Sequence, residues 1–86
     1  MIFGNKRDES EIIAQILFSA KNKIKKTPLL YKTNISYSNF TKYFNFLLEK
    51  KFIEEKEGNP GGKVYQTTEK GEQLLDSINK LIKHIQ

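Results

Sequence analysis

Residues 34–53, NISYSNFTKYFNFLLEKKFI, decide the fold, because a helix start signal is followed there by an apolar repeat of helical period. Ser36 offers a hydroxyl that can cap a helix, and the sequence predicts this helix over residues 36–50. Successive side chains are rotated by about 100° around a helix axis, so residues at a small angle from Phe40 lie on the same face of the helix. The buried side is then predicted to hold Tyr37, Phe40, Tyr43, Phe44, Leu47 and Leu48.

The opposite side of this helix is polar. Serine, threonine, asparagine and lysine can donate to phosphates, and asparagine and lysine can also pair with base edges. The candidate DNA contacts are Ser38, Thr41, Lys42 and Asn45 on this side, together with Asn39 on its flank. Tyr37 joins them through its hydroxyl, with its ring packed inward. Taken one at a time these are ordinary solvated positions, and only the whole set favours DNA contact. Phe46 lies on the flank, where a partner, the hairpin or partial burial against the first helix would explain it.

Two shorter helical segments precede this helix. Asp8 and Glu11 have the spacing of a capping box, and apolar residues recur at helical spacing over a first helix predicted at residues 9–21. Thr27 can cap a second helix, predicted at residues 28–32, because proline is tolerated at the first helical position. Two helices joined by a tight turn form a helix-turn-helix unit, whose second helix commonly enters a DNA groove.

The sequence after residue 51 predicts a hairpin and a final helix. Two extended runs flank GNPGG at residues 58–62, which predicts a two-stranded hairpin over residues 52–67. Thr68 can cap a helix over residues 69–85, in which Leu74 and Leu75 are expected in the core. The rest of its apolar seam predicts a homodimer, with a monomer and a frayed tail as the alternative. The predicted dimer interface consists of Ile78, Leu81, Ile82 and Ile85.

The order of these elements is that of a winged helix-turn-helix domain. At 86 residues the chain is long enough for one core, so a single domain is predicted over residues 1–86. The fold class is mostly α with a two-stranded β-hairpin, which would form the wing. The last helix would serve dimerisation.

The sequence also resembles a known family. Residues 34–53 resemble the Asn-Leu-Ser-Tyr opening and the following Lys-Tyr-aromatic-x-x-Leu-Leu-Glu-Lys helix of small archaeal winged-helix proteins of about ten kilodaltons, some of them chromatin-associated DNA binders. Residues 64–75, VYQTTEKGEQLL, resemble the family's Tyr-x-x-Thr-x-Lys-Gly-x-x-Leu-Leu passage. The resemblance implies DNA binding and a surface near the DNA backbone ahead of the second helix. Lys51 stands where the family commonly has glycine, which implies a left-handed lysine or a different helix cap.

The charge of the chain is unevenly distributed. The net charge is +5, and all of the positive excess lies in the first 51 residues. A basic half is the usual electrostatic footprint of a nucleic-acid binder, and a lysine-rich solubility surface is the alternative. The lysines expected to contact phosphates, besides Lys42, are Lys25, Lys26, Lys32 and Lys63. In the hairpin, Lys56 and Lys63 are expected to face DNA, with Glu54, Glu55 and Glu57 turned away.

Several classes of function are not expected. The chain has no cysteine and one histidine, His84, so no metal site or other cofactor is predicted. It lacks a phosphate-binding glycine loop and a nucleophile beside a base, so an enzyme is not expected. Its start does not read as a signal peptide, and no apolar run suits a membrane span, so we expect a cytoplasmic, nucleoid-associated protein.

The sequence therefore predicts double-stranded DNA binding, as a transcription regulator or as a chromatin-type architectural protein. The alternative is a winged helix that serves as a protein–protein interaction module without direct DNA binding.

Overall fold

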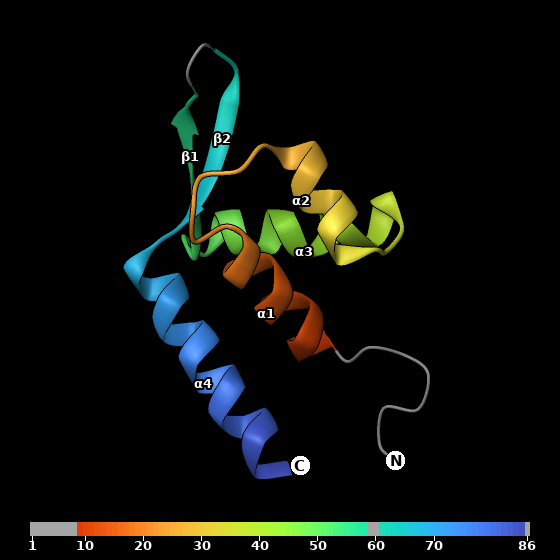
Figure 1. Ribbon diagram of the computed structural model, residues 1–86, viewed down its shortest axis with the longest axis vertical. Helices are drawn as coiled ribbons and strands as arrows, with labels where there is room; N and C mark the ends of the chain where they lie inside the picture. Colours follow the sequence, from red (N-terminus) through yellow and green to blue (C-terminus); the bar gives the residue numbers. More distant parts are fainter. Residues whose placement is uncertain (1–8, 59–60, 86) are drawn as a thin grey trace.

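The computed structural model describes residues 9–58 and 61–85, without the side chains of residues 82–85. It confirms the predicted order of helix, helix-turn-helix, hairpin and helix (Figure 1). The elements are α1 (Glu9–Ser19), α2 (Lys26–Thr33), α3 (Tyr37–Glu49), β1 (Ile53–Glu57), β2 (Lys63–Thr67) and α4 (Glu69–Ile85). In Figure 1, α3 crosses the middle of the molecule, the hairpin projects above it, and α1 and α4 lie below. None of the described helices is long and apolar enough to cross a membrane.

The core lies where α1, α2, α3 and the hairpin meet. Phe40 and Phe44 stack with ring centroids 5.2 Å apart, and Tyr65 of β2 meets Phe44 edge-on at 4.8 Å. Most of the α3 rings are thus core, as predicted, with Tyr43 and Leu48 half-buried. The prediction that Tyr37 lies on the buried side is wrong, because this residue is 62% exposed. It is the first residue of α3, and the Lys26 ammonium lies 5.7 Å from the centroid of its ring.

The hairpin is antiparallel, and its second strand also pairs with one residue outside the hairpin, Ile24. β1 pairs with β2 so that Glu55 lies opposite Tyr65. Ile24, between α1 and α2, exchanges two backbone hydrogen bonds with Tyr65, at 3.1 and 2.8 Å. The Thr67 hydroxyl donates to the carbonyl of Leu17 at 2.6 Å. The wing is therefore joined to the end of α1, which explains why α1 ends at Ser19 instead of residue 21.

Two helix starts agree with their sequence signals and one does not. The Ser36 hydroxyl accepts from the Asn39 amide at 3.2 Å, and the Thr68 hydroxyl accepts from the Gly71 amide at 3.0 Å. The predicted cap at Thr27 is wrong, because α2 begins at Lys26 with Lys25 as an N-cap that makes no side-chain hydrogen bond. Thr27 and Pro28 then lie in the first turn, where backbone amides have no helical partner in any case. Asp8, the other half of the predicted capping box, lies outside the described residues.

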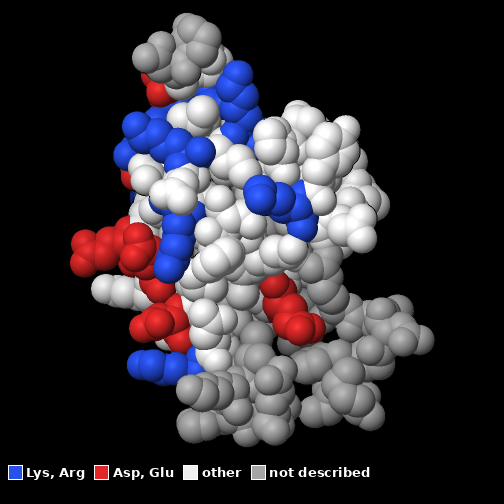
Figure 2. All heavy atoms as spheres, in the orientation of Figure 1, with Lys and Arg blue, Asp and Glu red and all other residues white. Residues whose placement is uncertain are grey.

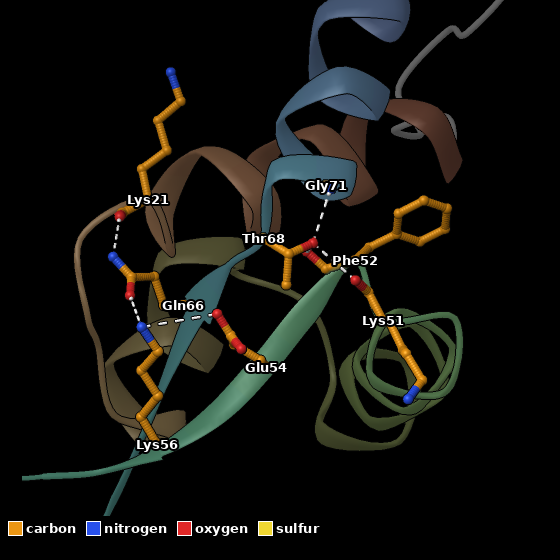
Figure 3. Close-up of polar contacts among 8 residues, drawn as sticks. All are labelled: Lys21, Lys51, Phe52, Glu54, Lys56, Gln66, Thr68 and Gly71. Atoms are coloured by element: carbon orange, nitrogen blue, oxygen red, sulfur yellow. Dashed lines mark hydrogen bonds and ion pairs between the residues drawn. The ribbon is translucent and has the colours of Figure 1, made fainter.

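The connection between α3, β1 and α4 is tightly built (Figure 3). Lys51 has a φ of 64°, so its backbone is left-handed. This is one of the two outcomes expected for a lysine where the resembling family commonly has glycine. The Thr68 hydroxyl lies 2.7 Å from the Lys51 carbonyl and 3.1 Å from the Phe52 carbonyl, to either of which it can donate. A Cβ atom added at Gly71 would lie 2.1 Å from the Phe52 carbonyl oxygen. Glycine is therefore required where α4 passes over the start of β1.

The predicted seam of α4 is only partly available to a partner. Ile78 is 8% exposed and belongs to the core, so its assignment to a dimer interface is wrong. The reason is that α4 packs along α1, which covers this face within the same chain. Leu75 is buried as predicted, Leu74 is half-buried, and Leu81 is 56% exposed. The predicted side chains of Ile82 and Ile85 lie outside the described part of the structure.

Candidate nucleic-acid interface

The outer face of α3 presents polar side chains to solvent. Ser38, Asn39, Lys42 and Asn45 are exposed, as expected for groove contacts. Ser36 caps the helix, so the first turn that carries Ser38 and Asn39 is held in place. Thr41 differs from the expectation, because its Oγ1 atom is buried and has no hydrogen-bond partner among the described residues. The face that could enter a groove therefore consists of the four other residues.

Lys42 is held by a carboxylate from another helix. Its Nζ lies 3.8 Å from Oε2 of Glu9 at the start of α1, and the Tyr43 hydroxyl donates to the same oxygen at 3.3 Å. Both charged side chains are largely exposed, so the ion pair contributes about 0–1 kcal/mol and a phosphate could replace it. Sequence reasoning missed Glu9, because no local pattern relates residue 9 to the middle of α3.

Phe46, unexplained by the sequence, borders a small hollow between α1 and α3. The hollow has a volume of about 270 Å³ and is lined by Glu9, Ile13, Lys42, Tyr43 and Phe46. The Phe46 ring also lies 6.2 Å from the ring of Phe52. Phe46 is 40% exposed, so its ring borders the hollow without being buried against the first helix.

Lys26, the first residue of α2, lies beside the start of α3. Lys26 Nζ is 5.7 Å from the ring centroid of Tyr37 and 5.2 Å from that of Phe44. Lys25, the N-cap residue, is exposed. Lys32 is exposed near the end of α2, and its carbonyl accepts from the Gln15 side chain at 2.6 Å. The structure thus brings Lys26 close to Tyr37 at the N-terminal end of α3, and the exposed Lys25 precedes it in the chain.

The wing lysines are neutralised by wing carboxylates, which corrects the expectation that these carboxylates turn away. Lys63 Nζ lies 3.3 Å from Oε2 of Glu55, and this hydrogen bond is the main cause of the raised pKa of Lys63. Lys56 Nζ lies 3.7 Å from Oε2 of Glu54 and 2.7 Å from Oε1 of Gln66 (Figure 3). Lys56 and Glu54 are two residues apart and so share one face of β1, whereas Lys63 of β2 is paired with Glu57 and reaches Glu55 diagonally. Burial raises the pKa of Tyr65 beneath them.

Positive and negative side chains are largely separated on the visible surface. In Figure 2 most lysines gather over the upper half, around the hairpin and the segment before α2, and most carboxylates lie lower. A polar hollow of about 340 Å³ marks the acidic side, and its lining includes Glu69, Glu72 and Asp76 of α4 together with Lys21. Among the described residues, no group of three or more His, Cys, Asp or Glu could hold a metal ion.

Comparison with known proteins gives matches over nearly the whole chain. The sequence profile described as winged helix-turn-helix matches residues 6–86. Two uncharacterised proteins of Methanocaldococcus jannaschii are similar: MJ0290 is 40% identical over 81 residues and MJ0287 is 32% identical over 77 residues. These alignments cover 93% and 88% of this chain, but 36% of MJ0290 and 74% of MJ0287. The chain therefore spans little more than a third of MJ0290.

A solved structure agrees with the same assignment. The crystal structure of Sso10a-2, a DNA-binding protein from Sulfolobus solfataricus, superposes with a TM-score of 0.77 at 32% sequence identity. The superposition covers 90% of this chain and 80% of that one. These matches agree with the archaeal winged-helix resemblance of residues 34–53 and 64–75.

Proposed function

Because the chain belongs to the winged helix-turn-helix family, we propose that it binds double-stranded DNA with α3 in the major groove. The observation that carries the proposal is the outer face of α3, where Ser38, Asn39, Lys42 and Asn45 are exposed together. Lys26 lies beside the N-terminal end of the helix, the exposed Lys25 precedes it in the chain, and both would contact phosphates. The similarity to Sso10a-2, a DNA-binding protein, supports the same function.

The proposed role is binding without catalysis, on the DNA of the nucleoid in the cytoplasm. Two versions are carried forward, a transcription regulator and a chromatin-type architectural protein. A regulator is expected to prefer one sequence over bulk DNA by about 10³-fold or more, because specific sites commonly exceed non-specific ones by that margin. Competition between selected and random duplexes separates the two versions.

Lys42→Glu tests whether α3 faces DNA. In a gel mobility shift with a random duplex at about 50 mM salt, the substitution is expected to weaken binding about tenfold or more, because one phosphate or base contact becomes a repulsion. The matched control is Lys80→Glu, an exposed reversal on α4. Equal binding by Lys42→Glu and wild type would place α3 away from DNA. Absence of duplex binding by the wild type as well would instead favour the protein-interaction module without direct DNA binding.

We also propose that the protein forms a homodimer through the exposed edge of α4. Leu81 is the described residue that supports this, since a large apolar side chain is left in solvent on the last helix. Leu81→Lys is expected to convert the dimer to a monomer in sedimentation analysis, because a buried ammonium at a two-fold contact would be repeated in both copies. A dimer mass unchanged by Leu81→Lys refutes this interface. A monomeric wild type at micromolar concentration refutes the homodimer.

A further inference from the structure

The segment of residues 21–26 leads from α1 into the first residue of α2, Lys26, with bends at Lys21 and Asn22 and a β-bridge at Ile24. Its backbone is joined to β2 by the two hydrogen bonds between Ile24 and Tyr65, and the Gln66 side chain donates to the Lys21 carbonyl at 3.1 Å. Ile24 packs against the core, so the side chains on either side of it turn the other way. Lys23 and Lys25 are accordingly exposed. The segment therefore presents lysines to solvent along the edge of the wing.

An exposed aromatic ring lies near each end of this segment. Phe18 is 66% exposed, and its ring centroid is 5.8 Å from Lys21 Nζ. Tyr37 is 62% exposed, and its ring centroid is 5.7 Å from Lys26 Nζ. Neither ring belongs to the core cluster. Both ends of the lysine segment thus combine an ammonium group with a ring that is open to solvent.

Exposed rings among lysines suit unpaired bases better than a duplex. In a duplex the faces of the bases are covered by their neighbours, whereas a single strand can stack each base on an aromatic side chain while its phosphates meet cations. We propose that Phe18, Tyr37 and the lysines of residues 21–26 form a binding surface for single-stranded nucleic acid. The bases stack on the two rings, and Lys23 and Lys25 neutralise the phosphates between them.

The two ends of this surface differ in their electrostatic surroundings. Lys21 also borders the polar hollow lined by Glu69, Glu72 and Asp76, whose carboxylates repel phosphate. Tyr37 instead lies beside Lys26, which the exposed Lys25 precedes in the chain. The ring of Tyr37 is therefore expected to contribute more to binding than the ring of Phe18.

The test uses the full chain and a fluorescein-labelled twelve-residue thymidine oligonucleotide, with binding followed by anisotropy at about 50 mM salt. Tyr37→Leu is expected to weaken binding about fivefold or more, the lower end of the effect of one lost base stack. Phe18→Leu is expected to weaken it about twofold to fivefold. Tyr37→Phe keeps the ring and should bind within about twofold of wild type. Tyr31→Leu removes a 75% exposed tyrosine elsewhere, on α2, and this variant should also bind the oligonucleotide within about twofold of wild type.

Three outcomes would overturn the proposal: no binding of the oligonucleotide, equal losses for Tyr31→Leu and Tyr37→Leu, or a loss for Tyr37→Phe as large as that for Tyr37→Leu. The last would assign the effect to the hydroxyl group. The surface partly overlaps the proposed duplex site, so a labelled duplex is measured in parallel. Oligonucleotide binding without duplex binding would support this inference and refute the proposed function. Duplex binding without oligonucleotide binding would refute this inference and support the proposed function. Phe18→Leu is expected to leave duplex binding unchanged.

Discussion

Gly71→Ala is expected to destabilise the protein by about 3 kcal/mol or more. The new Cβ would lie 2.1 Å from the Phe52 carbonyl oxygen and 2.7 Å from Cγ2 of Thr67, and the first of these neighbours is backbone that cannot rotate away. Overpacking of this kind costs about 1–3 kcal/mol and occasionally more. It would also displace the Gly71 amide from the Thr68 hydroxyl that caps α4. For a chain of 86 residues, such a loss is a large part of the total stability of about 4–13 kcal/mol.

Urea denaturation followed by circular dichroism measures this effect. Gly61→Ala is the matched control, because a Cβ atom there meets no neighbour within 4 Å among the residues that the structure describes. The control is expected to change the free energy of unfolding by less than about 0.5 kcal/mol. If Gly71→Ala unfolds at the same urea concentration as wild type, the close passage of α4 over Phe52 is wrong.

Reversing Lys25 and Lys26 together is expected to give the largest loss of duplex binding. If each lysine neutralises one phosphate, their replacement by glutamate should lower affinity about 10²-fold at 50 mM salt, because contacts are lost and repulsions are added. Lys25 is exposed, and Lys26 is half-buried over the rings of Tyr37 and Phe44, beside the start of α3. The measurement is anisotropy of a labelled random duplex.

The double variant Lys70→Glu/Lys80→Glu supplies the control, since it changes the net charge equally on exposed positions of α4. It is expected to weaken binding much less, through long-range repulsion alone. Equal losses for the two double variants would mean that net charge, and no particular surface, determines binding. The circular dichroism spectrum of each variant verifies that the fold is kept.

Local signals predicted much of this fold, because the interactions involved lie within a few residues. Ser36 and Thr68 cap the next helix turn with their own hydroxyls, and the strands β1 and β2 pair on either side of the GNPGG segment. Thr27 was misassigned although its chemistry suits a cap. Pairing of Ile24 with Tyr65 instead sets where the extended segment ends and α2 begins. That pairing joins residues distant in sequence, so no local pattern reveals it.

The candidate site was predicted less completely than the fold, since its errors depend on tertiary neighbours. Helical phase assigned Tyr37 to the buried side, but its side chain is 62% exposed and the Lys26 ammonium lies near its ring. Ile78 carries the spacing of an interface residue, yet α1 covers it. Glu9 beside Lys42 and Glu55 beside Lys63 change the electrostatics of the proposed contacts. Each of these facts requires knowing which elements pack together.

The salt dependence of duplex binding tests the central proposal most directly. If about five lysines each neutralise one phosphate, the logarithm of the association constant should fall against the logarithm of salt concentration with a slope of about −4 to −5. Wild-type protein and a labelled random duplex, titrated between about 50 and 200 mM salt, are sufficient. A slope in that range, reduced by about 2 in Lys25→Glu/Lys26→Glu, is the predicted result. No duplex binding at 50 mM salt, or a slope near zero, would contradict it.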